Sequence, residues 1–283
     1  MYRKSQPLAT GVPLQLDINQ YKKTGKRSLA VTAQTMIQTL SDEKEPIVTL
    51  HIRPAKTIQP FAAKQDLPNS KDKTSILASC IAVALVSVRF AHLEQLSFYG
   101  LGLGNQDTVK ICTALSQAKL EKLEHIEFYN NKIGSLGINQ LSDALQSLPA
   151  LRYVQLDTNQ LDENGLTALA ALVNKLPKLK TLNLKDTQLH SVKGIANFAK
   201  SLSQHTCLQT LNLSETKMTA EQIKHMIDAM GKNTSLKKLS LASNDINAEN
   251  FKRLCEMLKK HPSIKSLDIG YTTPKGSERN YAL

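Results

Sequence analysis

The sequence predicts an α/β solenoid in which short parallel strands alternate with helices. A strand-like spacing of apolar residues recurs every 28 to 30 residues from Leu93 onward, and an apolar helical face recurs within each interval. A repeat array also accommodates 283 residues without one large core, because each unit packs against its neighbours.

The strand half of each unit has the spacing L-x-x-L-x-L-x-x-N-x-L. Its first residue falls at Leu93, Leu123, Leu151, Leu179, Leu208, Leu236 and Ile264. The Asn position holds Leu101, Asn131, Asn159, Thr187, Thr216, Asn244 and Thr272. An Asn side chain there can hydrogen-bond the backbone of its own coil and of the neighbouring coil, whereas Thr does so less completely and Leu not at all. We therefore expect the coil that carries Leu101 to be irregular.

The helical half of each unit repeats in phase with the strand. The residues 13, 10 and 6 positions before the next strand start are apolar: Ile138, Leu141, Leu145; Leu166, Leu169, Val173; Ile195, Phe198, Leu202; Ile223, Met226, Met230; and Phe251, Leu254, Leu258. Steps of three and four place each set on one helical face, as in a helix that packs against a core. Thr219-x-x-Gln222 fits a capping box, and Asp162, Ser191 and Asn247 occupy equivalent starting positions.

Short turns join each helix to the next strand. Leu148-Pro149 and Leu176-Pro177 fit such turns, because proline ends a helix and need not donate a hydrogen bond. His205 and His261 fill the same turn position, so we interpret them as structural rather than catalytic.

The spacing divides the chain into four parts. Residues 1–46 are predicted to form an N-terminal cap of one strand, within 12–18, and one helical stretch at 29–40. Residues 47–92 form an irregular first repeat with a long loop at 54–73, followed by a helix at 74–90. Residues 93–272 carry the regular repeats, and residues 273–283 are a polar tail.

Composition limits the class of protein. The net charge is +12, with 29 Lys and 7 Arg, which can favour nucleic acid or an acidic membrane but also suits a solvated outer surface. The cysteines lie far apart at Cys80, Cys112, Cys207 and Cys255, so we interpret them as small buried hydrophobes in a reducing, cytoplasmic compartment. The most apolar run, 76–88, is too short to span a membrane, and no signal peptide is apparent.

The strand motif, the full helix and the 28–30-residue period together resemble the ribonuclease-inhibitor-like subclass of leucine-rich repeat proteins. The resemblance covers residues 93–283, and we expect 47–92 to belong to the same array. It implies a right-handed horseshoe, with a parallel sheet on the concave side and helices on the convex side. Members of the subclass include inhibitor-like binders, GTPase-activating proteins, immune receptors, actin-end cappers and secreted bacterial effectors. They share the binding of protein partners rather than a chemistry.

In such a horseshoe the residues that flank the buried strand positions would line the concave surface as ladders about 5 Å apart. Aromatic and acidic side chains gather in three neighbouring coils. The predicted partner-binding residues are Tyr99, Tyr129, Tyr153, His125, Glu127, Gln155, Asp157 and Lys185. Exposed Tyr on a polar surface fits an interface anchor, although Tyr is also common on strands for its β-propensity.

A catalytic interpretation receives little support. His125, Glu127 and Asp157 could be neighbours on the sheet, but we expect an open surface with nothing to exclude water or shift a pKa. Gly100-x-Gly102-x-Gly104 lacks the spacing of a phosphate loop and falls where the repeat bends. We therefore predict no enzyme activity, cofactor, metal or small-molecule substrate.

The predicted function is non-catalytic binding of a protein partner on the concave face, by a monomer. One form of this function is a bacterial effector that is secreted without a cleaved signal peptide and acts in a host cell. Two alternatives stay open: a basic scaffold for nucleic acid or acidic lipid, and a GTPase regulator.

Overall fold

The computed structural model describes residues 14–17, 49–53, 92–161, 164–189 and 194–271. It also describes nine positions before residue 92, namely Ser75, Ala78, Ser79, Ile81, Ala82, Val83, Leu85, Val86 and Phe90. The predicted helix at 29–40, the loop at 54–73, the tail at 273–283 and the cap residues Asp162 and Ser191 lie outside the described residues.

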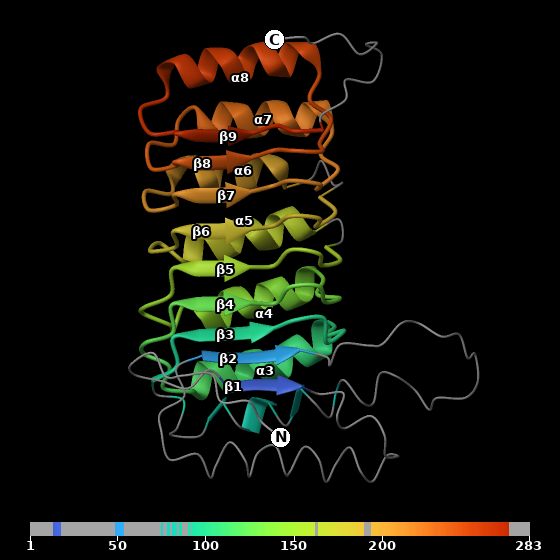
Figure 1. The fold of residues 1–283 in the computed structure, drawn as a ribbon, viewed down its shortest axis with the longest axis vertical. Helices are drawn as coiled ribbons and strands as arrows, with labels where there is room; N and C mark the ends of the chain where they lie inside the picture. The colour runs from blue at the N-terminus through green and yellow to red at the C-terminus, as the bar shows by residue number, and fades with distance from the viewer. Residues whose placement is uncertain are drawn as a thin grey trace, which may run out of the picture.

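The described strands form one parallel sheet in which spatial order follows chain order (Figure 1). The strands are β1 Leu14–Asp17, β2 Thr49–Arg53, β3 Gln95–Phe98, β4 His125–Glu127, β5 Tyr153–Gln155, β6 Thr181–Asn183, β7 Thr210–Asn212, β8 Lys238–Ser240 and β9 Ser266–Asp268. From β3 onward each strand coincides with a predicted strand position. The register repeats without a slip, since Leu96 lies opposite Ile126 and Ile126 lies opposite Val154.

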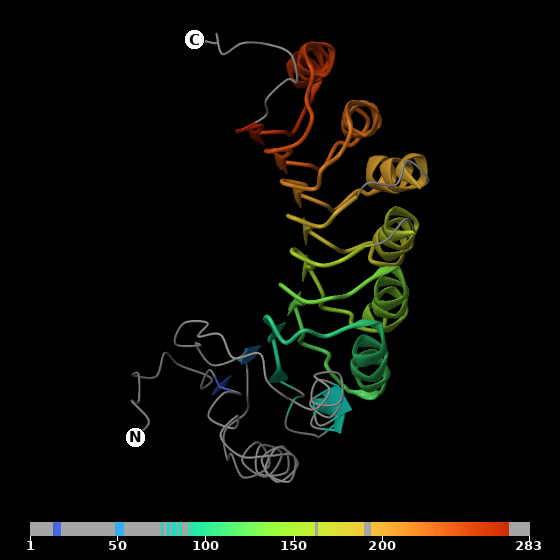
Figure 2. The same ribbon diagram turned by 90° about the vertical axis from the view of Figure 1, so that its right-hand side faces the viewer.

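One helix follows each strand from β3 to β8, and each contacts the next helix along the chain. These helices are α3 Asn105–Gln117, α4 Ser135–Leu145, α5 Gly165–Lys175, α6 Ile195–Gln204, α7 Ala220–Met230 and α8 Ala248–Lys260. Figure 2 shows the helices along the outer, convex side of an open arc and the strands along its inner side. A full helix is wider than the spacing between strands, so stacking the two layers bends the array.

The core lies between the two layers and continues from coil to coil. The central residue of each strand from β3 to β8 is buried, as is the apolar residue two positions later. Phe98 and Phe128 fill that second position in adjacent coils, and their rings stack with centroids 4.8 Å apart. Truncating one such buried side chain to Ala typically costs about 2–5 kcal/mol, because the coils on both sides hold the cavity open.

Asparagine side chains join each coil to the coil before it. The Nδ2 atom of Asn159 donates to the carbonyls of Phe128 (2.8 Å) and Leu156 (2.7 Å), and its Oδ1 atom accepts from the backbone N–H of Ile133 (3.0 Å). Asn131 and Asn244 do the same in their coils. At the same position the Thr187 hydroxyl donates to the Leu184 carbonyl of its own coil. The predicted difference between Asn and Thr is confirmed.

The expected irregularity of the Leu101 coil is absent from its backbone turn, because the positive φ angles of Gly100 and Gly102 recur at the equivalent positions Asn130 and Lys217. Gly100 and Gly102 adopt positive φ angles of 61° and 72°, which glycine tolerates because it has no Cβ. The N–H groups of Leu101 and Leu103 both donate to the Oδ1 atom of Asn131 at 3.1 Å, so the next coil bonds this one as it does elsewhere in the array.

The predicted caps and turn histidines have the expected structural roles. Thr219 and Gln222 form a reciprocal capping box at α7, and the Asn247 side chain accepts from Asn250 N–H at α8. The Nδ1 atom of His205 accepts from the Leu208 N–H (3.0 Å), so Nε2 must carry the proton that bonds the Leu176 carbonyl (2.9 Å).

Two predictions about burial are wrong. Phe251 was expected on the inward face of α8, but its side chain is 48% exposed, because no described helix packs on the outer side of α8. The cysteines were expected to be buried, but Cys207 is exposed, since it lies in the turn after α6, and Cys255 is only partly buried. Cys112 does lie in the core, where burial raises the pKa of its thiol to about 12 and leaves it unreactive at neutral pH.

A substitution series at His205 tests its structural role. Asn233 fills the same turn one coil later, and its side chain bonds the Leu202 carbonyl and the Leu236 N–H. We expect His205→Ala to lower the free energy of unfolding by about 3 kcal/mol, because a buried donor and a buried acceptor lose their partner. His205→Asn should cost less than about 1 kcal/mol. Urea unfolding of both variants measures the difference, and equal losses would contradict the hydrogen-bonding role.

Candidate partner-binding surface on the concave face

The side chains that flank the buried strand centres form three rows on the inner face of the sheet, because strand side chains alternate between faces. The first row runs Gln95, His125, Tyr153, Thr181, Thr210, Lys238, and the second runs Ser97, Glu127, Gln155, Asn183, Asn212, Ser240, Asp268. The third row, just beyond the strands, runs Tyr99, Tyr129, Asp157, Lys185. The strand register places each residue of the first two rows directly opposite the next.

Four aromatic side chains of these rows form two stacked pairs, which we call the aromatic patch. The rings of Tyr99 and Tyr129 lie 4.8 Å apart, and those of His125 and Tyr153 lie 5.0 Å apart. These distances match the spacing between parallel strands, so the backbone itself holds the rings in contact. The Tyr153 hydroxyl also donates to the Oε1 atom of Gln155 at 2.7 Å, which fixes one ring further.

Asp157 is buried beside this patch, with only 6% of the residue exposed. Burial raises the pKa of its carboxyl to about 6; a hydrogen bond from Gln155 opposes that rise and the charge of Glu127 adds to it. Its Oδ1 atom has no hydrogen-bond partner among the described residues. The expectation that nothing on this surface shifts a pKa is therefore wrong, because the neighbouring coils exclude water from Asp157.

Lys185 follows Asp157 in the third row but is paired elsewhere. Its Nζ atom lies 3.1 Å from the Oε1 atom of Glu215, in the next coil. The hydrogen bond and the charge of Glu215 raise the pKa of Lys185. Both side chains are 47% exposed, so this ion pair contributes little to stability.

The C-terminal half of the concave face differs from the aromatic patch, because its polar side chains bond one another. The Ser214 hydroxyl donates to Asn212 Oδ1 (2.6 Å) and contacts the hydroxyl of Ser240 (2.6 Å), which in turn donates to Asp268 (2.9 Å). Asn212 also accepts the backbone N–H of Ser214. These four side chains therefore bond mainly to one another.

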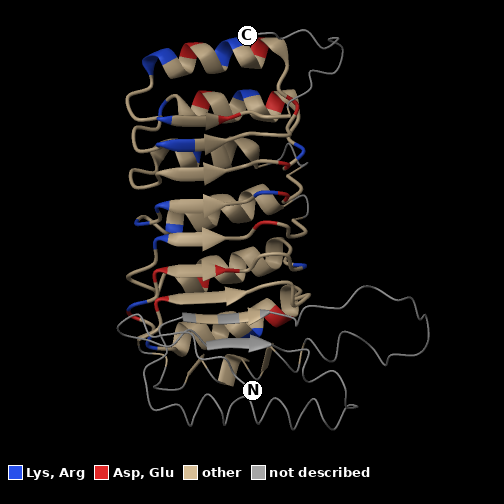
Figure 3. Ribbon diagram, viewed as in Figure 1, with Lys and Arg blue, Asp and Glu red and all other residues tan. Residues whose placement is uncertain are grey.

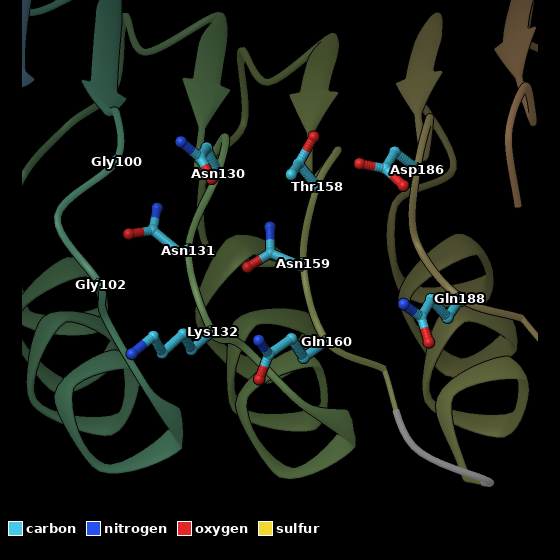
Figure 4. A pocket seen from close by; sticks show the side chains of 10 residues that line it. All are labelled: Gly100, Gly102, Asn130, Asn131, Lys132, Thr158, Asn159, Gln160, Asp186 and Gln188. Carbon is cyan, nitrogen blue, oxygen red and sulfur yellow. The ribbon is translucent and has the colours of Figure 1, made fainter. Parts of the chain in front are cut away.

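A polar hollow of about 350 Å³ lies where the strands end, beside the third row (Figure 4). It is lined by Gly100, Gly102, Asn130, Asn131, Lys132, Thr158, Asn159, Gln160, Asp186 and Gln188. Sequence reasoning missed this hollow. The sequence feature that could have indicated it is the residue after the third row. This residue is Gly100, Asn130, Thr158 or Asp186, and it has a positive φ in every case. Gly, Asn and Asp tolerate that conformation, which marks a recurring turn.

The structure brings seven of the eight predicted site residues together on β3, β4, β5 and the positions just beyond these strands, and Lys185 lies one coil further. Whether they bind a partner stays a prediction.

Within the described part of the chain, no group of three His, Cys, Asp or Glu side chains could hold a metal ion. No described helix combines the length and the apolar character needed to cross a membrane.

Comparisons with known proteins support the class of fold. The profile described as the TMOD/LMOD leucine-rich domain matches residues 163–279. Together with the alternating parallel strands and helices, this match makes the chain a leucine-rich repeat solenoid. The matched region begins after Asp157, so it does not include the aromatic patch. The narrower ribonuclease-inhibitor-like subclass stays a prediction.

A solved structure of an internalin (inlF) from Listeria monocytogenes is similar, with a TM-score of 0.41 and 14% sequence identity. The similarity covers 88% of this chain and 58% of the internalin chain, so this chain spans less than two thirds of that protein's length. No curated protein sequence matches the chain.

The strained turn at Thr158 gives a prediction about stability. Thr158 is β-branched and has a φ of 54°, whereas Asn130 adopts the same angle one coil earlier. A β-branched residue in this conformation is strained, and Asn relieves part of the strain. We expect Thr158→Asn to raise the free energy of unfolding by about 1 kcal/mol and the matched reverse change, Asn130→Thr, to lower it by about as much. Chemical denaturation checks both, and changes of the same sign would contradict the strain.

The pKa of Asp157 gives a prediction about pH. The pKa of an unfolded Asp is about 3.9. Between about pH 4 and pH 6 the folded chain therefore binds more protons than the unfolded chain. The contribution of Asp157 to stability therefore falls as pH rises through this window, by at most about 3 kcal/mol. Asp157→Asn should exceed the parent protein in stability at pH 7.5 and differ little from it at pH 4.

The exposed Asp268 provides the control for this measurement, because Asp268→Asn should change stability by less than about 0.5 kcal/mol at either pH. If Asp157→Asn destabilises the protein at pH 7.5, the carboxylate has a stabilising donor and its burial is not a cost.

Proposed function

We propose that this chain is a non-catalytic interaction module that binds a protein partner with the aromatic patch and the polar side chains beside it. Leucine-rich repeat domains generally mediate protein–protein interaction. The observation that supports this particular surface is the pair of ring stacks on three adjacent coils. Tyr offers a large contact area with few rotatable bonds, and stacked rings have already lost most of their freedom before a partner binds.

The charge around the patch favours a protein over a phosphate backbone. Glu127 lies on β4 and Asp157 lies just beyond β5, within the rows that form the patch. The basic residues of the described chain lie mainly at strand ends and on helices (Figure 3). A nucleic acid or acidic lipid would therefore meet carboxylates at the centre of the concave face. The basic-scaffold, GTPase-regulator and host-cell effector interpretations stay predictions that no described residue favours.

Substitution of the three tyrosines tests the proposal. The triple variant Tyr99→Ala, Tyr129→Ala, Tyr153→Ala removes the rings while keeping the apolar strand centres. Aromatic anchors commonly contribute about 2 kcal/mol each or more, so we expect the affinity for a captured partner to fall by about 100-fold or more. The partner is identified by capture from cell extract and mass spectrometry, and its affinity is then measured with purified proteins.

A matched control carries Thr181→Ala, Thr210→Ala and Lys238→Ala, which occupy the first row in the C-terminal half. It should bind as the parent protein does, and thermal unfolding should show that both variants are folded. Partner affinity that is unchanged in the tyrosine variant would contradict the proposal. Affinity that falls steeply with salt but is indifferent to the tyrosines would support the basic scaffold instead.

A further inference from the structure

We infer that Asp157, Glu127 and the rings of Tyr129 and Tyr153 form a receptor for one arginine side chain, presented by a basic segment of the protein partner. This inference rests on the proposed function, since it names what the partner must offer to the same surface.

The unpartnered carboxylate oxygen of Asp157 carries the inference. Its residue is more than nine-tenths buried, and the Oδ1 atom has no hydrogen-bond partner among the described residues. A buried acceptor without a donor costs about 1–3 kcal/mol, and more when the group is ionised. Almost none of the Oδ1 surface is exposed, so a ligand reaches this atom only after a neighbouring side chain moves. A cationic donor that then bonds the oxygen recovers the cost on binding.

The surroundings of Asp157 select the chemistry of that donor. Tyr129 precedes it in the third row. Burial raises the pKa of Tyr153, and the charges of Glu127 and Asp157 add to that rise. Two carboxylates attract a cation, and aromatic faces attract it through their electron density. A planar guanidinium can stack on a tyrosine ring while it donates two hydrogen bonds to carboxylates, which an ammonium cannot do.

The protein's own nearest cation does not meet this need. Lys185 follows Asp157 in the same row, but its ammonium group pairs with Glu215 in the next coil. Its side chain is nearly half exposed and can move aside when a ligand approaches. The polar network of Asn212, Ser214, Ser240 and Asp268 is satisfied internally and offers no equivalent position.

Short peptides provide the probe. Acetyl-Gly-Arg-Gly-amide is titrated into the isotopically labelled full chain at pH 7.5, beside the same peptide with citrulline, which has the shape of arginine without its charge. We expect the arginine peptide to shift the amide resonances of Glu127, Gln155 and Asp157 and to bind about tenfold more tightly than the citrulline peptide.

Two matched variants locate the effect. Asp157→Asn should weaken binding of the arginine peptide by about tenfold, because the amide keeps the size of the side chain and loses its charge. Asp268→Asn removes an exposed carboxylate from the second row, in the same concave face, and should leave binding unchanged. Thermal unfolding confirms that both variants are folded.

The outcomes separate this inference from the function on which it rests. Absence of arginine-specific shifts, equal binding of citrulline, or full binding by Asp157→Asn overturns the arginine receptor. If the captured partner still depends on the three tyrosines in that case, the protein-binding function stands without it. If arginine binding depends on Asp157 while partner capture ignores the tyrosines, Asp157 binds arginine but the proposed docking surface is wrong, and the assignment of the arginine to the protein partner is overturned with it.

Discussion

Backbone hydrogen bonds between successive coils are the constraint on which the rest of this structure depends. They join the strands and continue beyond them, where the Asn130 N–H donates to the Asp157 carbonyl and the Thr158 N–H donates to that of Lys185. The Asn side chains of the repeat add a second set of bonds inside the core. Both sets of bonds require equivalent residues to lie opposite each other. A shift of the strand register by one residue would therefore turn every side chain of that strand to the wrong face.

This fixed register converts a sequence pattern into a surface. Residues 28 to 30 positions apart in the sequence lie about 5 Å from each other, whatever their chemistry, because this is the spacing between neighbouring strands. Where two such residues are aromatic they stack, and where one is a carboxylate between larger neighbours it is buried. The Tyr99–Tyr129 stack and the burial of Asp157 are therefore two results of one geometry. Neither needs a loop or a bound group to hold it in place.

The sequence alone predicted the regular part of the fold, because leucine spacing and helical phase are local signals. It identified the strands from Gln95 onward, the capping box at Thr219 and the structural character of His205. It failed at Phe251 and Cys207, since burial there depends on whether a following coil covers the residue. It placed Asp157 on the concave face but missed its burial, which depends on the side chains of adjacent coils rather than on its own strand.

The contrast between the two halves of the concave face argues that the array is specialised at one end. In the C-terminal half Asn, Ser and Asp side chains satisfy one another, and the surface is small and polar. In the coils of β3 to β5 the rings are large and the Oδ1 atom of Asp157 has no donor. Thr158, the next residue, occupies a conformation that suits glycine or asparagine better. The positive φ of Thr158 recurs at Glu215, Ser243 and Tyr271, so it belongs to the turn of the repeat. The buried Asp157 oxygen without a donor is different, because it reduces stability without serving the fold. A free-energy cost at Asp157, beside the aromatic patch, is what a binding surface requires when its partner provides the missing contact.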